Sequence, residues 1–348
     1  MKKLIFSIIA CTTFFSLRAQ VIEGTVYDAK TRETLIGVVI YLDGTSIYTT
    51  SDKEGKFRIV VENKVNTRLV LSHLSYEPLI IQNPFERRAK AFYLEEKITM
   101  ISGALVVAER FSHEEMIKVF REQFLGTSEG GKSCIIKNEE DIRLKYDRET
   151  NTLMGQAIHP IVVENKYLAY HIIFDLHSFS IQYTEETLNT DKAIKASFKG
   201  TSSFIDQNPN SIQYKKRREE TYLKSSQHFW KSLSVGALDE EKFKIFNRFK
   251  QVKPEQYFLI SNTEPQKVVI ILPGTDINLK YSNVHEIEES VYGVIGIMYK
   301  NYYRSDVVFL TDRFTIDDYG NPDTVDELLF SGDMGDQRLG DMLPVDYK

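Results

Sequence analysis

Residues 52–61 read DKEGKFRIVV, a tight-turn signal followed at once by an alternating strand. Asp52 and Gly55 suit the backbone of a hairpin turn, and Phe57 restarts an apolar face. Comparable turn signals recur about every ten residues on either side of this stretch. Strands are therefore predicted at residues 22–27, 38–42, 56–61, 67–74, 79–82 and 91–94. About seven short strands at this spacing predict a β-sandwich with one thin core between two sheets.

An ordered series of short motifs in the same region resembles the carboxypeptidase-regulatory-like domain. The series is Gly24-x-Val26-x-Asp28, Leu35-x-Gly37-Val38, Gly44-Thr45, Asp52-x-x-Gly55-x-Phe57 and Leu71-Ser72-x-Leu74-Ser75-Tyr76. Two turn positions depart from the family pattern, since Thr34 stands where proline is more frequent and Ser75 stands where glycine usually precedes the tyrosine. The resemblance implies a seven-stranded transthyretin-like β-sandwich over residues 21–97.

The same resemblance implies no peptidase activity. The domain accompanies zinc carboxypeptidases but carries none of their catalytic residues. It also precedes many exported Gram-negative proteins, including TonB-dependent receptors. The resemblance therefore favours an envelope protein over an enzyme.

The first 19 residues have the pattern of a secretory signal peptide. Lys2 and Lys3 form a basic start, and an apolar stretch of roughly 14 residues follows. A helix that spans a bilayer needs about 20 residues, so a retained anchor is not expected. Cleavage fits after Ala19 or Gln20, whereas lipid attachment at Cys11 fits less well because the apolar run continues beyond it. We predict export, to the periplasm or in association with the outer membrane.

Charge and cysteine content narrow the range of partners. Loss of Lys2, Lys3 and Arg18 with the signal changes the formal net charge from −5 to −8, which argues against nucleic acid as a partner. Cys134 is then the single cysteine, so no intramolecular disulfide can form. No later segment reaches about 18 uninterrupted apolar residues, and no transmembrane helix is predicted after the signal.

The rest of the chain is predicted to form a linker at residues 98–111 and a β-rich α+β domain at residues 112–348. Ser112 and the acids after it begin a helix on which Met116, Phe120 and Phe124 recur at helical spacing. A second helical pattern covers residues 215–233. A meander is predicted from strands at residues 141–146, 152–158, 160–163 and 168–174, followed by strands at 268–272, 292–299 and 307–310.

This second part resembles an uncharacterised C-terminal extension that accompanies the same sandwich in exported proteins. The resemblance rests on residues 124–126, 160–176, 222–233 and 341–347, the last of which read DMLPVDY. It implies no known activity.

Two stretches of the sequence match catalytic motifs but lack the structural context or the ligands that those motifs need. Residues 126–133 read GTSEGGKS, which satisfies both the Walker A pattern and Gly-x-Ser-x-Gly. Both motifs need a strand before the loop and a helix after it, and here the order is reversed. Gly126 is instead expected to cap a helix and the remainder to be an exposed loop. His285 and Glu288 have zinc-carboxypeptidase spacing, but no histidine beyond His285 completes a ligand set.

The strand predicted around residues 170–179 holds the best metal-binding constellation. His171, Asp175 and His177 share one face by two-residue alternation, and His159 is a further candidate from a facing strand. We favour the alternative that these three residues lie on the solvent-exposed face of an antiparallel sheet whose other face is buried. Structural roles are expected for His73, His113, His228 and the thiol of Cys134, which borders an apolar run. We therefore predict no catalytic, cofactor-binding or metal-binding residues.

Three functions remain open on the sequence alone. The preferred one is a non-catalytic envelope protein in which the sandwich positions a second β-rich domain that binds a protein or a glycan. The 19 Tyr and 21 Phe supply apolar contact surface for such binding. The alternatives are a metal-dependent hydrolase built on the His171 strand and an accessory factor of outer-membrane assembly or transport. Metal content and envelope fractionation distinguish them.

The signal peptide gives a first testable prediction. In a Gram-negative host, the exported protein should begin at Gln20 or Val21, because the basic and apolar regions end there and strand alternation starts. N-terminal sequencing of the envelope fraction measures this directly. A first residue of Met1 would contradict the prediction.

Overall fold

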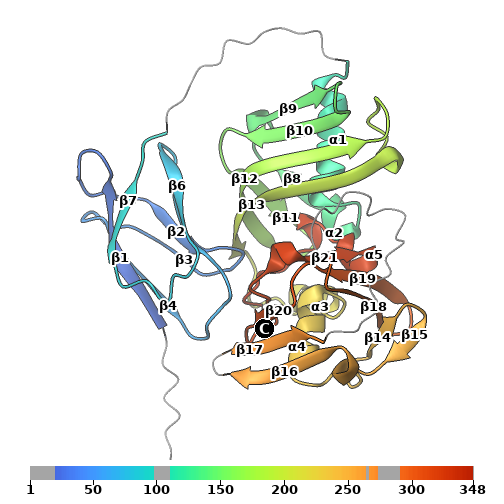
Figure 1. Cartoon of the computed structure of the whole chain (residues 1–348). Helices are drawn as coiled ribbons and strands as arrows, with labels where there is room; N and C mark the ends of the chain where they lie inside the picture. Colours follow the sequence, from blue (N-terminus) through green and yellow to red (C-terminus); the bar gives the residue numbers. More distant parts are fainter. Residues whose placement is uncertain (1–19, 98–109, 264–265, 273–290, 348) are drawn as a thin grey trace, which may run out of the picture.

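The computed structural model describes residues 20–97, 110–263, 266–272 and 291–347. The predicted signal peptide at residues 1–19, most of the predicted linker at 98–111 and the motif at His285 lie outside these ranges. Within them, no helix is both long and apolar enough to cross a bilayer. The described chain is mainly β, as predicted, and its strands form several separate sheets (Figure 1).

The N-terminal part is a sandwich of two sheets, blue in Figure 1. One sheet has the order β4-β1-β7 and consists of β1 (Gln20–Asp28), β4 (Lys56–Val61) and β7 (Ala91–Leu94). The other has the order β3-β2-β5-β6 and consists of β2 (Val39–Leu42), β3 (Tyr48–Thr50), β5 (Leu69–His73) and β6 (Tyr76–Ile81). Val26 and Phe57 of the first sheet share one core with Leu42 and Leu71 of the second. The predicted seven-stranded sandwich is confirmed, and β3 is the strand that the sequence pattern did not indicate.

The predicted turn at residues 52–55 forms, but it does not close a hairpin. The Asp52 carboxylate accepts hydrogen bonds from the backbone N–H groups of Glu54 and Lys56, at 3.0 and 2.8 Å. Gly55 has a φ of 72°, in the region that favours glycine. The strands on either side pair elsewhere, β3 with β2 and β4 with β1. The turn therefore carries the chain from one sheet of the sandwich to the other.

The second part begins with a six-stranded antiparallel sheet. Its strands are β8 (Cys134–Ile136), β9 (Ile142–Asp147), β10 (Thr152–Ala157), β11 (Ile161–Asn165), β12 (Tyr170–Tyr183) and β13 (Ala193–Asp206). The predicted meander is wrong in its order, because β12 is much longer than expected. One edge of β12 pairs with β13 along its whole length. The other edge pairs with β11 over the first half of β12 and with β10 over the second half.

Helix α1 (His113–Leu125) packs on this sheet and begins with the predicted cap. Ser112 Oγ accepts a hydrogen bond from the Glu115 backbone N–H at 3.3 Å, and the Glu115 carboxylate accepts one from the Ser112 N–H at 2.8 Å. Phe120 and Phe124 are fully buried, and the Phe120 ring lies 4.7 Å from the ring of Phe179. The predicted helix is therefore confirmed as the element that closes this core.

The glycine-rich stretch after α1 is not the exposed loop that was predicted. Gly126 does end the helix, with a φ of 94°. The next residues form the short helix α2 (Glu129–Lys132), in which Gly130 and Gly131 are buried. A Cβ on Gly130 would lie 2.4 Å from the Gly340 carbonyl oxygen. At Gly130 a side chain is excluded by a backbone segment that is distant in the sequence, which a local motif cannot reveal.

The remaining chain builds two further sheets around one core. One has the order β15-β14-β18-β19-β21 and consists of β14 (Phe243–Asn247), β15 (Lys250–Val252), β18 (Gly293–Tyr299), β19 (Tyr303–Phe309) and β21 (Leu328–Ser331). The other consists of β16 (Phe258–Thr263), β17 (Gln266–Ile271) and β20 (Arg313–Ile316). Phe229 and Trp230 fill the space between the sheets.

The helical pattern predicted at residues 215–233 is split into two helices. They are α3 (Ile212–Tyr222) and α4 (Ser226–Ser234). Ser225 begins α4, because its Oγ accepts a hydrogen bond from the His228 backbone N–H at 3.1 Å. The cap competes with helix continuation at this point, which an apolar periodicity alone does not show.

The sandwich docks on the second part through the turn at residues 43–46. The Gly44 N–H donates to the Ser202 carbonyl at 2.7 Å, and the Ser202 N–H donates to the Asp43 carboxylate at 2.8 Å. The Phe204 N–H donates to the Thr45 carbonyl at 2.9 Å. These bonds extend the edge of β13 with backbone from the sandwich, so the two parts share a short stretch of sheet.

Residues 339–347, which we call the C-terminal clamp, run through the place where the parts meet (Figure 1). The Val345 N–H donates to the Gly44 carbonyl at 2.8 Å. The Val345 carbonyl accepts hydrogen bonds from the side-chain amides of Gln227, at 2.9 Å, and Asn321, at 2.8 Å. One residue of the clamp thus joins the sandwich, helix α4 and the loop after β20.

The turn between the two sandwich sheets gives a second prediction. Gly55→Ala should lower the free energy of unfolding by ~2–4 kcal/mol, because an added Cβ would lie 2.8 Å from the Val26 carbonyl oxygen as well as take up a positive φ. Gly37→Ala is the matched control, since Gly37 has a φ of 74° but no atom within 4 Å of the added Cβ, and should lose only ~1 kcal/mol. Chemical denaturation of the mature chain measures both. Equal losses would show that the close approach has no cost.

Candidate functional site

The strand favoured for metal binding does not assemble a site. His171 and Asp175 lie half-buried on one face of β12, opposite Glu164 and Thr201 on the neighbouring strands. The register between β12 and β13 shifts at a bulge that contains His177, which is exposed. The predicted alternation is therefore present, but the bulge interrupts the row.

The sheet face that carries Asp175 is partly covered by the sandwich and is not fully exposed to solvent. Tyr41 of the sandwich reaches this face and shares a 2.8 Å hydrogen bond with Thr201. Burial raises the pKa of the Tyr41 hydroxyl, and the negative charge of Asp175 adds to the increase. The expected solvent face is thus used in part for docking the sandwich.

The other metal candidates are dispersed. His159 Nδ1 lies 3.1 Å from Asp141, and His73 Nδ1 accepts a hydrogen bond from the Ser75 N–H at 3.3 Å. His113 is exposed at the start of α1. In the part of the chain that the structure describes, no three His, Cys, Asp or Glu side chains are grouped so as to hold a metal ion.

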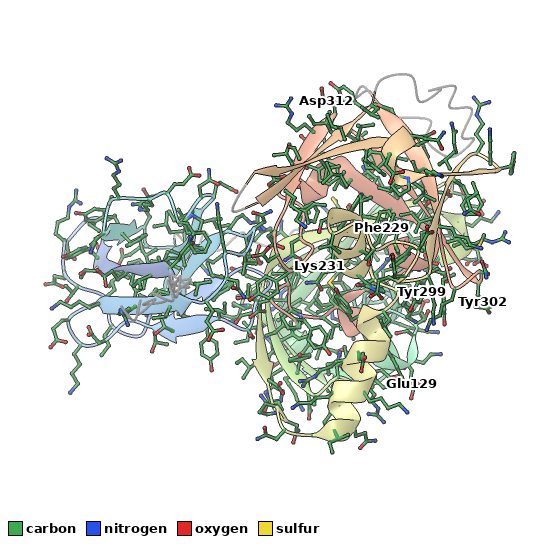
Figure 2. The ribbon with its side chains drawn as sticks, turned by 90° about the horizontal axis from the view of Figure 1, so that it is seen from below. Glu129, Phe229, Lys231, Tyr299, Tyr302 and Asp312 are labelled. Carbon is green, nitrogen blue, oxygen red and sulfur yellow. The ribbon has the colours of Figure 1, made fainter. Side chains whose placement is uncertain are left out.

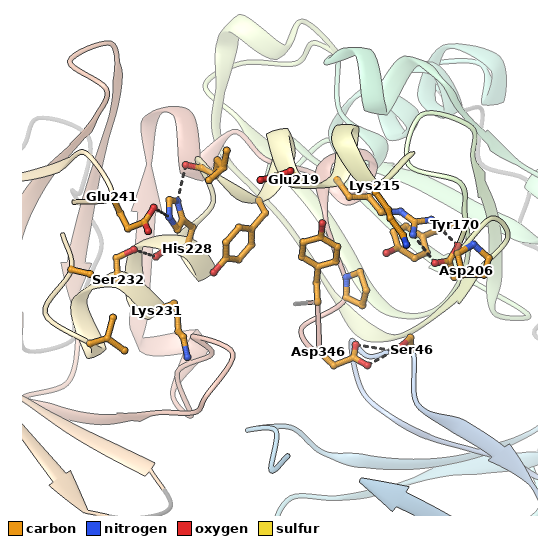
Figure 3. Close-up of a pocket in the computed structure, with 18 residues that line it drawn as sticks. Ser46, Tyr170, Asp206, Lys215, Glu219, His228, Lys231, Ser232, Glu241 and Asp346 are labelled. Atoms are coloured by element: carbon orange, nitrogen blue, oxygen red, sulfur yellow. Dashed lines mark hydrogen bonds and ion pairs between the residues drawn. The ribbon is translucent and has the colours of Figure 1, made fainter. Parts of the chain in front are cut away.

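A cavity of 980 Å³ lies where the sandwich, helices α3 and α4 and the C-terminal clamp meet (Figure 3). Its wall includes Ser46, Tyr170, Asp206, Lys215, Arg218, Glu219, Tyr222, His228, Lys231, Ser232, Glu241, Pro344, Asp346 and Tyr347. Figure 3 shows His228 and Glu241 at one end of the cavity and Tyr170 and Asp206 at the other. Because three parts of the chain contribute, the cavity exists only when the parts are docked.

One end of the cavity is held by a buried arginine. Arg218 is 3% exposed and makes a bidentate ion pair with Asp206, at 2.6 and 2.8 Å. It also donates to the carbonyls of Leu168 and Ala169, at 2.8 and 3.2 Å, and its guanidinium lies 4.0 Å from the centre of the Tyr170 ring. Burial opposes ionisation of Asp206, but the hydrogen bonds from Arg218 and from the Asn208 N–H, together with the charge of Arg218, outweigh it and lower the pKa of that carboxyl. The charge of Arg218 is therefore fully paired within the protein.

The other end holds a buried histidine. His228 Nδ1 lies 2.7 Å from the Leu223 carbonyl oxygen, and Nε2 lies 3.1 Å from a carboxylate oxygen of Glu241. The ring packs against the rings of Tyr222 and Phe243, at 5.0 and 4.8 Å. Both nitrogens face oxygen acceptors, so the His228 ring is fixed in place by the protein on every side.

Between these two ends the cavity offers aromatic surface and unpaired polar groups. Tyr222 and Tyr347 are half-buried, and their ring centres are 5.8 Å apart. Burial raises the pKa of Tyr222 to about 12, with the charge of Glu241 adding to the shift, so both the ring and a neutral hydroxyl face the cavity. Lys215 and Glu219 are exposed beside them, and no ion pair joins either to another described residue.

No local sequence motif indicated this site. His228 and Glu241 are separated by 13 residues and Gln227 and Val345 by 118, so their pairing depends on tertiary packing. The weak sign that did exist was that Tyr222, His228 and the DMLPVDY segment all belong to the pieces quoted for the C-terminal resemblance. Their meeting at one cavity is what the structure adds.

Cys134 gives a third prediction. Burial raises the pKa of its thiol to about 12, the charge of Asp341 adds to the increase, and its Sγ lies 3.3 Å from the Gly130 carbonyl oxygen. The folded protein should therefore react with a thiol reagent at pH 8 at least about 100-fold more slowly than the unfolded chain. Labelling kinetics with and without guanidinium measure the ratio, and Cys134→Ser is the control for reagent background. Equal rates would mean that the thiolate is accessible in the fold.

Comparison with known proteins bears on the sandwich alone. No curated protein matches the chain. Residues 22–106 match the family described as the CarboxypepD_reg-like domain, and the match covers all seven strands except the first two residues of β1. The family is a regulatory-like domain and not a catalytic one. The N-terminal sandwich of this chain therefore belongs to the carboxypeptidase regulatory-like domain family.

Proposed function

We propose that this chain is an exported, non-catalytic protein of the cell envelope that binds a protein or glycan ligand in the cavity at the junction of its parts. The observation that carries the proposal is the make-up of that cavity. Its most buried polar side chains already have partners within the protein, Arg218 in Asp206 and His228 in Glu241, while aromatic rings and free polar groups line its middle. Such a surface suits recognition.

The paired groups also argue against acid–base catalysis in this cavity. To take a proton from a ligand, His228 would have to give up its hydrogen bond to Leu223 or to Glu241. Arg218 makes four hydrogen bonds within the protein, which occupy four of its five N–H donors. Both residues therefore act as supports of the cavity wall.

The ligand class follows from the residues that remain available. The rings of Tyr222 and Tyr347 offer faces on which a sugar ring or an apolar side chain can stack. Lys215 and Glu219 stand beside them with charges of opposite sign. A ligand with an apolar face and a polar rim, such as a glycan or a peptide, is complementary to this arrangement.

The envelope location rests on the first residues of the chain and on the domain family. The basic start and short apolar stretch at residues 1–19 have the pattern of a secretory signal. The regulatory-like sandwich is of the kind that accompanies exported proteins. Cleavage at Gln20 would leave β1 at the start of the mature chain, since the strand begins at that residue.

Ligand binding gives a fourth prediction. Envelope glycan fragments and peptides are screened against the mature protein, and any ligand found is titrated by calorimetry. Tyr222→Ala and Tyr347→Ala should each weaken binding at least about tenfold, because each removes one stacking face. Tyr48→Ala, which removes an exposed ring from the sandwich, is the control and should bind normally.

The same titration separates binding from catalysis. The ligand should be recovered unchanged after long incubation with the protein. Release of a product would contradict the non-catalytic part of the proposal. Equal affinity of the Tyr222 and Tyr347 variants and the unchanged protein would show that the cavity is not the binding site.

A further inference from the structure

A second surface, outside the cavity wall, carries a group of lysine and arginine side chains that form no close ion pair. It surrounds the hairpin turn between β18 and β19, at residues 300–302. We call it the basic tip, and it consists of Tyr302 and five cations, Lys224, Lys242, Lys244, Lys300 and Arg304. None of these residues lines the cavity.

The fold gathers the five cations at one end of one sheet. The Lys300 N–H donates to the Lys242 carbonyl at 3.0 Å, which holds two neighbouring turns together. Lys244 and Arg304 both stand opposite Met298, on the strands to either side of β18. The Lys224 ammonium lies 5.3 Å from the centre of the Tyr303 ring, on the strand that leaves the turn.

These cations form no close ion pair with the described residues, although the charge of Lys224 acts on the buried carboxyl of Asp341 and opposes the rise in its pKa. Ion pairs elsewhere in the described chain join nitrogen and oxygen atoms within 4.0 Å, but none of the five cations has such a partner among the described residues. The carboxylates on adjoining turns are Asp239, Glu240, Glu241 and Asp333. Two of these are engaged, Glu241 by His228 and Asp333 by the Arg304 backbone N–H. The five cations outnumber these four carboxylates, whereas the chain as a whole carries a net charge of −5.

The tip projects outwards, with an aromatic ring at its end. Tyr302 is 77% exposed, and its ring meets the ring of Tyr303 edge-on at 5.1 Å. Figure 2 shows Tyr302 at the outer margin of the molecule. A convex tip suits a broad, flat partner, whereas a single sugar chain or a small anion is usually bound in a groove.

We propose that the basic tip docks on the anionic headgroup surface of a lipid bilayer. Lysine and arginine side chains place their charges at such a surface from flexible stems, and each contributes an increment of attraction. Tyr302 adds a ring with one apolar and one polar end, which suits the boundary between headgroups and acyl chains. An acidic polysaccharide shares the charge but not the flat shape, so the bilayer is the better complement.

Vesicle binding by the mature full-length protein tests this proposal. The protein should co-sediment with vesicles of phosphatidylcholine mixed with phosphatidylglycerol, and not with vesicles of phosphatidylcholine alone. Binding should fall steeply as salt is added, because the attraction is screened. Equal binding to both vesicle types, or binding to neither, would overturn the proposal.

Charge-matched variants locate the surface. Lys242→Gln, Lys300→Gln and Arg304→Gln combined should lower the vesicle partition coefficient by roughly 100-fold. Lys118→Gln, Lys195→Gln and Lys199→Gln combined remove the same charge from exposed positions elsewhere and should cause little loss. Melting curves confirm that both variants fold. Similar losses for the two would mean that net charge alone drives binding, and the assignment to the tip would fail.

Two further measurements distinguish a bilayer from a soluble polyanion as the partner, and the basic tip from the cavity as the binding site. Dextran sulfate stands for a soluble polyanion. If it displaces the protein at equal charge concentration and binds more tightly than the vesicles, the partner is a polysaccharide and the bilayer proposal is wrong. Tyr222→Ala, which alters the cavity, should bind vesicles like the unchanged protein, so failure of one proposal does not imply failure of the other.

Discussion

The backbone N–H and C=O of Val345 are the groups on which the arrangement of the whole molecule depends. Its N–H bonds to the sandwich at Gly44, and its carbonyl bonds to Gln227 of α4 and to Asn321 after β20. Buried backbone groups must find partners, so these three bonds fix the clamp and the parts around it in one relative position. The next residue repeats the pattern, since the Asp346 carboxylate accepts from the Ser46 N–H at 2.9 Å and from its hydroxyl at 2.7 Å. The contacts that join the parts therefore also form part of the cavity wall.

Carboxylates take the same role on both sides of the joint. Asp43 of the sandwich receives a backbone N–H from β13, and Asp317 after β20 receives the N–H of Asn66 from the sandwich at 2.8 Å. Asp317 is 3% exposed, and burial raises its pKa even though hydrogen bonds from its neighbours oppose the shift. Bonds of this kind depend on direction as well as distance. The joint therefore specifies the relative orientation of the two parts more strictly than non-directional apolar packing would.

Local patterns predicted what is local in the fold. The sandwich followed from turn signals and alternation, and α1 followed from Ser112 and its helical spacing. Strand β3 was not predicted because three residues are too few to show a clear alternation. The order of β10, β11 and β12 and the burial of Gly130 escaped because both depend on segments far away in the sequence. The cavity was invisible for the same reason, since its three contributors lie in different thirds of the chain.

The position of the clamp late in the sequence affects the order of assembly. Synthesis from the N-terminus produces residues 43–46 long before residues 339–347 exist to bond with them. Before the clamp exists, the turn can bond to β13 through the Gly44 N–H and the Thr45 carbonyl, but the Gly44 carbonyl and the Ser46 N–H have no partner from the clamp. The joint is therefore completed only when synthesis reaches the last residues, and a protease that met the nascent chain would find the joint only partly formed.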